Sequence, residues 1–199
     1  EASICLEYLE MIEEEDAKYL KELTSSSETG DKEYKAQARY DKPYPETDRR
    51  NYFDVIKSIC GFINAEGGTV LVGYHEKDLQ FVGIKVTDEE NRGTKGPDTD
   101  KMSDDEFIDW WELFIRQHLE RHTEGHIAGE MIKFEFPKIN DLICAVITVE
   151  PVSGKKDRVW CRHIKGKYSE EKRKHILPMV LFQRQGPKTN KIGERYQDS

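Results

Sequence analysis

The sequence has no long apolar run, little cysteine and no excess of positive charge, and each absence limits what the protein can be. Its 199 residues contain no stretch near the roughly 18 apolar residues that a membrane span requires. The N-terminal residues lack the basic and then apolar pattern of a secretory signal peptide. The first residue is not methionine, so we expect a processed chain or a piece of a longer one. These features predict a cytoplasmic protein with no membrane partner.

The four cysteines are scattered and form no CxxC pair. Cys60 and Cys144 lie inside apolar runs, where a free cysteine behaves as a small hydrophobic residue. We therefore expect reduced thiols in the core of a cytosolic protein. A zinc site that uses Cys161 and His163 is the alternative.

The net charge is −8, which over the whole chain argues against attraction to the phosphates of a nucleic acid. The basic residues are unevenly distributed, however, because 13 of the 31 lie between Lys155 and Arg195. Only four acidic residues fall in the same stretch. This asymmetry indicates a nucleic-acid or other anionic partner, although a solvated basic loop explains it equally well.

Apolar periodicity predicts a mixed α/β chain. Helices are expected over residues 4–23, 49–64 and 103–121, the last with Ser103 as its N-cap. Strands are expected over residues 32–40, 69–74, 80–84, 130–136 and 142–149, with shorter ones at 159–161 and 179–184. The glycines of Asn64-Ala65-Glu66-Gly67-Gly68 are expected to end the second helix in a turn, because glycine adopts positive φ without strain. We divide the chain into an N-terminal helix, residues 1–24, and one α/β domain, residues 25–199, with a basic insert around residues 153–176.

Three carboxylates are candidates for a functional site: Glu28, Glu33 and Glu76. A turn at Gly30-Asp31 would bring Glu28 back beside Glu33, and Glu76 follows the strand predicted over residues 69–74. Clustered carboxylates repel one another and stay ionised only with a cation nearby, and Mg²⁺ or Mn²⁺ suits oxygen ligands. In a chain with 39 acidic residues, such a triplet also arises by chance.

A longer pattern resembles the Schlafen AlbA-like domain. It comprises Glu28-x4-Glu33-Tyr34-Lys35, the segment ICGFINAEGGTVLVG from Ile59 to Gly73, Val82-Gly83-Ile84, and FQRQGPKT from Phe182 to Thr189. The family has, in the same order, an E-x4-E-x-K segment, a helix that ends in a phrase like AFANTEGG, a strand like LLIGV, a VVG-like strand and a segment like YIRxGxST. The match covers most of residues 28–192. The resemblance implies a Schlafen core AlbA-like fold of the α+β class, a mixed sheet flanked by helices.

The same resemblance implies a metal-dependent endoribonuclease that cleaves structured RNA such as tRNA. Family members with nuclease activity use two glutamates of the first segment and an aspartate after the GV strand. Carried across by position, these fall on Glu28, Glu33 and Glu76, which would hold one or two Mg²⁺ or Mn²⁺ ions. Lys35 would stabilise phosphate charge beside them. The family commonly has two consecutive acids after GV, whereas this chain has His75-Glu76.

Further basic residues are expected to contact the RNA backbone: Arg39, Lys155, Lys156, Arg184 and Lys188. Phosphate contacts of this kind position a substrate without reading its sequence, and structured RNA is recognised largely by shape. Vertebrate family members build a U-shaped basin from two related lobes in one chain. This chain holds one copy of the motif set, so we expect a homodimer.

Two other functions stay open from the sequence. Many family members lack the carboxylate set and are described as DNA-binding modules, so the first alternative is a non-catalytic DNA- or RNA-binding module of a regulator. The second is a nucleotide-binding or protein-interaction domain, in which the basic insert has no role. For Lys35, the alternative to phosphate binding is a plain ion pair with Glu33 or another nearby acid.

Overall fold

The computed structural model describes residues 2–36, 38, 51–85, 99–124, 127, 129–154, 157–163, 167–169, 174–176 and 178–195. The N-terminal half contributes α1 (Ala2–Leu23), β1 (Lys32–Lys35), α2 (Asn51–Ile63), β2 (Gly68–Val72), β3 (Tyr74–His75), β4 (Gln80–Phe81), the 3-10 turn η1 (Thr99–Lys101), α4 (Asp104–His122) and β5 (Thr123–Glu124). The C-terminal part contributes η2 (Gly129–Met131), β6 (Ile132–Glu135), β7 (Lys138–Ile139), β8 (Leu142–Ile143), β9 (Ala145–Val149), β10 (Trp160–Arg162), β11 (Lys167–Ser169), β12 (Lys174–Ile176), β13 (Met179–Gln185) and β14 (Lys188–Arg195). The fold is of the mixed α+β class, as the sequence predicts.

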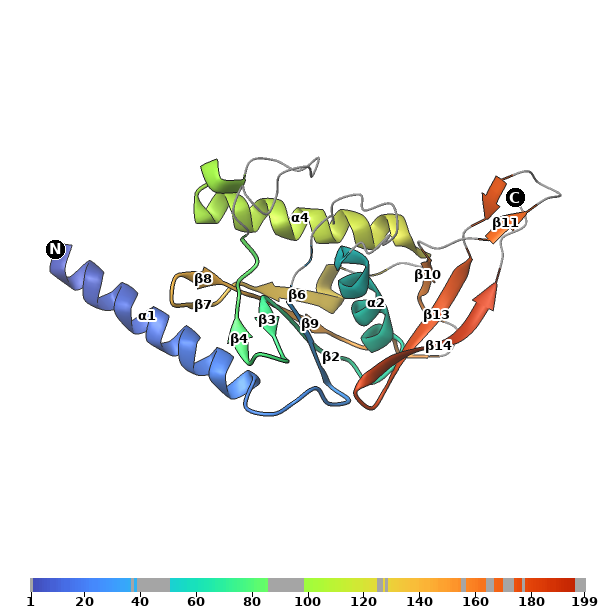
Figure 1. Ribbon diagram of the computed structural model, residues 1–199, viewed down its shortest axis with the longest axis horizontal. Helices are drawn as coiled ribbons and strands as arrows, with labels where there is room; N and C mark the ends of the chain where they lie inside the picture. Colours follow the sequence, from blue (N-terminus) through green and yellow to red (C-terminus); the bar gives the residue numbers. More distant parts are fainter. Residues whose placement is uncertain are drawn as a thin grey trace.

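Two sheets organise the described residues (Figure 1). The first has the order β1-β2-β9-β6, in which β1 pairs with β2 in parallel and the other pairs are antiparallel. The second has the order β14-β13-β10-β5 and is antiparallel throughout. Strand β1 is therefore an edge strand of the first sheet, and β13 and β14 form a long hairpin in the second.

The core lies on both faces of the first sheet because successive side chains of a strand point to opposite sides. Val70 and Val72 of β2 join the main apolar cluster, to which α2 and α4 contribute most of their buried residues. Leu71 points the other way into a smaller cluster, which contains Leu20 of α1 and Tyr34 of β1. The two clusters hold β1 and β2 in place, and both strands lead into the candidate site.

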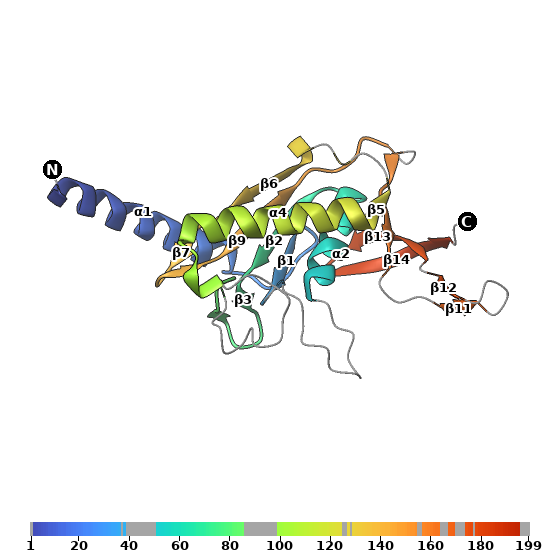
Figure 2. The same ribbon diagram turned by 90° about the horizontal axis from the view of Figure 1, so that it is seen from above.

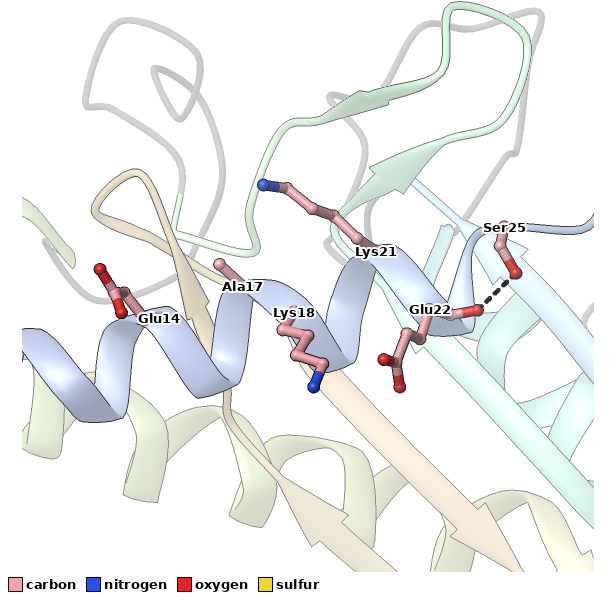
Figure 3. A pocket seen from close by; sticks show the side chains of 6 residues that line it. All are labelled: Glu14, Ala17, Lys18, Lys21, Glu22 and Ser25. Atoms are coloured by element: carbon pink, nitrogen blue, oxygen red, sulfur yellow. Dashed lines mark hydrogen bonds between the residues drawn. The ribbon is translucent and has the colours of Figure 1, made fainter.

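Helix α1 is attached mainly through its C-terminal half. The Asp16 carboxylate accepts a hydrogen bond from the Lys138 backbone N–H at 2.9 Å, and the Tyr34 hydroxyl donates to the Leu23 carbonyl at 2.8 Å. The N-terminal half projects away from the rest of the fold in both views (Figures 1 and 2). A hollow on this helix is lined by Glu14, Ala17, Lys18, Lys21, Glu22 and Ser25 (Figure 3).

The end of α2 is a structural turn, as predicted. Gly67 and Gly68 have φ values of 80° and 154°, and a Cβ atom at Gly68 would lie 2.5 Å from the Phe62 ring. The Asn64 amide donates to the carbonyls of Val159 and Phe182 at 2.9 and 2.8 Å, and it accepts from the Val159 N–H at 2.8 Å. The turn therefore joins the helix to strand β13 and to the residue before β10.

Most predicted elements are confirmed, and the differences concern strands. Ser103 is the N-cap of α4, in a capping box with Glu106. The strand predicted over residues 32–40 ends at Lys35. Strand β14 and the hairpin of β11 and β12, which lies inside the basic insert, were not predicted from the sequence. No helix among the described residues is long and apolar enough to cross a bilayer.

Candidate functional site

Three separate segments bring the predicted carboxylates to β1, the edge strand of the first sheet. Glu28 lies in the loop after α1, Glu33 is in β1, and Glu76 follows β3. The Gly73 N–H donates to the Lys35 carbonyl at 2.8 Å, so the chain leaving β2 stays beside the end of β1. This contact places the turn that carries Glu76 next to β1.

Glu28 and Glu76 are direct neighbours. The chain turns at Gly30-Asp31, as predicted, and folds Glu28 back along β1. The Glu28 carboxylate accepts a hydrogen bond from the Tyr34 N–H at 2.9 Å, which satisfies a backbone donor on the edge strand. The Glu28 N–H in turn donates to Glu76 Oε1 at 3.2 Å. Among the described residues, each of the two carboxylates uses only one of its oxygens in a hydrogen bond.

Glu33 is buried and paired with two cations. Its side chain is 10% exposed, with Oε1 bonded to the Lys35 ammonium and Oε2 to the Arg184 guanidinium. An ionised carboxylate out of water needs such compensation, since an unpaired buried charge is costly. The ion pair between Lys35 and Glu33 that the sequence left as an alternative is therefore present.

Arg184 is the most deeply buried cation of this cluster, at 1% side-chain exposure. Its Nη2 donates to the carbonyls of Thr29 and Lys32 at 2.8 and 2.6 Å, and its guanidinium lies 5.1 Å from the centre of the Phe62 ring. Its Nε is buried and has no hydrogen-bond partner among the described residues. The sequence suggested that Arg184 contacts RNA, but the structure places its side chain in the interior.

The Lys35 ammonium stands among the acidic groups of the site. Burial lowers the pKa of Lys35, and the negative charges of Glu28, Asp54 and Glu76 partly offset that effect. Asp54 lies in the first turn of α2 and is exposed. Sequence reasoning missed Asp54, because only the packing of α2 brings it close to the end of β1.

The other predicted RNA-contacting residues fall into two groups. Lys188 is exposed at the start of β14, and the Cα of Gly186, two residues earlier, lies 4.0 Å from the position that a Cβ atom of Gly30 would take. The tip of the β13–β14 hairpin is therefore beside the loop that carries Glu28. Arg39, Lys155 and Lys156 lie outside the described residues.

The geometry does not provide a ready three-carboxylate metal cage. Within the described ranges, no group of three His, Cys, Asp or Glu side chains has the spacing of a metal site. Both oxygens of Glu33 already bind cations of the chain itself. Mg²⁺ is usually held by one or two carboxylates together with substrate phosphates. Glu28 and Glu76 could provide such a pair of carboxylates without Glu33.

The three cysteines whose side chains the structure describes lie in the core. Cys60, Cys144 and Cys161 are free thiols and are buried, as the sequence predicts for Cys60 and Cys144. A hydrogen bond between the Cys60 thiol and Cys161, together with burial, raises the pKa of Cys60 well above its usual value. His163 packs edge-on against the Phe53 ring, with 5.5 Å between the ring centres. The described residues therefore offer no zinc group built on Cys161 and His163.

Comparison with known proteins gives the family. No curated protein matches the chain. A solution NMR structure of the N-terminal domain of a putative ATP-dependent DNA helicase RecG-related protein from Nitrosomonas europaea is similar, with 14% identity over 75% of this chain and 82% of that one, and a TM-score of 0.44. The family model described as "Schlafen, AlbA_2" matches residues 28–192. The chain therefore belongs to the Schlafen AlbA_2 family, a membership that supports a nucleic-acid-related function.

Proposed function

We propose that this protein is an endoribonuclease of Schlafen type that cleaves structured RNA, such as tRNA, with Mg²⁺ or Mn²⁺. The observation that carries the proposal is that the Glu28 N–H donates to the Glu76 carboxylate beside β1, where the charges of both glutamates act on the Lys35 ammonium. The three residues come from three separate segments, and the sequence resemblance selects the same positions. A carboxylate pair beside a cationic side chain suits phosphodiester chemistry, in which negative charge develops on phosphate oxygens.

Each residue has a proposed role. Glu28 and Glu76 would hold a divalent cation, which supplies a positive charge for phosphate oxygens. Lys35 would contact the same phosphate group through its ammonium. Glu33, proposed from the sequence as a third ligand, would have to exchange Lys35 or Arg184 to become one. Its contacts in this structure support a role in fixing the site instead.

The RNA would be held by its backbone. Lys188 is exposed beside the site, and we propose that it contacts a phosphate. Arg39, Lys155 and Lys156 are proposed to extend the same surface. Contacts to the RNA backbone do not distinguish one base sequence from another, which agrees with a substrate recognised by its shape. A homodimer would supply the second lobe of the basin, and sedimentation at micromolar concentration tests it, because a monomer there would exclude it.

A cleavage assay tests the proposal. The protein is incubated with a mixed tRNA pool in Mn²⁺, Mg²⁺ or EDTA, alongside Glu76→Gln. The amide keeps an acceptor for the Glu28 N–H but removes the charge that a cation needs. Discrete cleavage that requires metal, and that drops about 100-fold or more in Glu76→Gln, is the expected result. Glu66→Gln, an exposed position after α2, is the matched control and should cleave like wild type.

One observation favours a second candidate, a nucleic-acid-binding module without catalysis. The Glu33 carboxylate is fully paired with cations of the chain, as in a structural ion pair. In that case RNA or DNA is retained on a gel in EDTA as well as in metal, and no cleavage accompanies it. Glu76→Gln would then leave binding unchanged or strengthen it, since it removes a negative charge that repels phosphate.

A further inference from the structure

We propose that Arg184 is a positioning residue that holds the Lys35 ammonium in place through Glu33. This inference rests on the proposed function, because it concerns the group that would contact the phosphate. It assigns Arg184 a different task from the contact with RNA that the sequence suggested.

Arg184 is fixed on several sides. Two carbonyls of the loop and strand that carry the site, those of Thr29 and Lys32, accept from its Nη2. Its Nη1 also lies 3.4 Å from the Thr189 hydroxyl, and the Phe62 ring lies against the guanidinium. A planar guanidinium with this many partners has a single orientation, because its donors form a rigid fork.

Arg184 and Lys35 bind the same carboxylate, that of Glu33, so the position of Arg184 affects that of Lys35. Glu33 uses Oε2 for Arg184 and Oε1 for Lys35, so fixing one oxygen fixes the other. A lysine side chain has a flexible four-carbon stem and loses much rotamer freedom when it is held. Without Glu33 in this orientation, the ammonium keeps one described hydrogen bond, to the Tyr34 carbonyl at 3.2 Å, and loses the charged partner that holds it.

The side chains become more exposed in the order Arg184, Glu33, Lys35. The exposed fraction of the side chain is 1% for Arg184, 10% for Glu33 and 23% for Lys35. The series therefore runs from an interior anchor to a group that reaches solvent and the open edge of β1. The side chain at the buried end of such a series is shielded from solvent in this structure, and it can decide where the exposed end lies.

Chemical reactivity of Lys35 tests the proposal without requiring cleavage. A short pulse of acetic anhydride on the folded full-length protein, read by mass spectrometry, gives the labelling rate at Lys35 relative to Lys57. The variants are Arg184→Met, Arg184→Lys and Glu33→Gln, with Arg195→Met as the matched control, since Arg195 pairs with Glu124 away from the site. We expect Lys35 labelling to rise about tenfold in Arg184→Met and Glu33→Gln, less in Arg184→Lys, and not in the control.

The decisive comparison is the double variant Arg184→Met/Glu33→Gln. If Arg184 acts only through Glu33, adding Arg184→Met to Glu33→Gln changes Lys35 labelling by less than about twofold. This double variant also removes both charges of the buried pair, so it remains testable if Arg184→Met alone does not fold. The proposal is overturned if Arg184→Met raises labelling equally in both backgrounds, or if a folded Arg184→Met labels like wild type.

Cleavage kinetics separate this proposal from the proposed function. If Arg184 positions Lys35 for the transition state, kcat should fall by about tenfold or more in Arg184→Lys, with KM little changed. If the wild-type protein cleaves no RNA, the nuclease is excluded, yet the labelling experiment still decides whether Arg184 positions Lys35.

Discussion

The carboxylate of Glu33 forms a buried ion pair with the guanidinium of Arg184, which is 151 residues away in the chain. The pair joins β1 of the first sheet to the β13–β14 hairpin of the second. The other oxygen of the same Glu33 carboxylate binds Lys35, which is proposed to contact phosphate. Substitutions at Glu33 therefore affect stability as well as any activity, and the two effects must be measured separately.

We expect Glu33→Ala to lower the free energy of unfolding by about 3–5 kcal/mol, because it leaves the Arg184 charge buried without its partner. Urea denaturation followed by circular dichroism gives the value. Glu135→Ala is the matched control, since Glu135 pairs with Lys133 at an exposed site at 2.9 Å and should cost less than about 1 kcal/mol. Equal losses in the two variants would contradict the structural role of the Glu33 pair.

Much of the fold follows from local patterns in the sequence. Helix α4 was predicted because Ser103 can cap it and acidic residues occupy its first turn, and both features are local. Strand β14 was missed because its sequence, KTNKIGER, lacks the alternation of apolar and polar residues. Its exposed residues gain their strand structure from pairing with β13, a contact that local periodicity does not reveal.

From the sequence, Glu28, Glu33 and Lys35 could be assigned to one candidate segment, whereas their contacts and the approach of Asp54 could not be predicted. The spacing of Glu28, Glu33 and Lys35 marks the segment, and the turn at Gly30-Asp31 indicates that it folds back. Which oxygen meets which cation depends on how the β13–β14 hairpin packs against β1. That packing buries Arg184, whose sequence context shows only a basic residue near a glycine turn.

Asn64 provides a second stability prediction. Its side chain makes three buried hydrogen bonds to backbone groups of Val159 and Phe182, so Asn64→Ala leaves three buried backbone groups without that partner. We expect a loss of about 2–4 kcal/mol in the free energy of unfolding, since each unsatisfied group is costly. Asn190→Ala removes one exposed hydrogen bond to Gln185 and should stay within about 0.5 kcal/mol. A small effect at Asn64 would mean that water replaces these contacts.

Asp104 makes stability depend on pH in the acid range. Hydrogen bonds from Lys138 and Lys85 lower its pKa below the usual value of 3.8. Because the folded state binds the proton less readily, the stabilisation is present above about pH 3.8 and is lost as the pH falls through the lowered pKa. Asp104→Asn should remove this part of the acid sensitivity in urea titrations between about pH 2 and 5. The control is Asp109→Asn on the same helix. It keeps Asp104 and its partners, so it should retain the acid sensitivity that Asp104 causes.

Cys144 should be almost inert towards thiol reagents in the folded protein. It is fully buried, and this burial raises the pKa of its thiol to about 12. The reactive thiolate is then roughly 10⁻⁴ of the total at pH 8, whereas an unfolded thiol has a pKa of about 8.5. We therefore expect alkylation of Cys144 to be about 10³-fold slower in the native protein than in urea, with each cysteine resolved by mass spectrometry. Rapid labelling of Cys144 without denaturant would show that the strand pairing of β2 and β9 beside it opens readily.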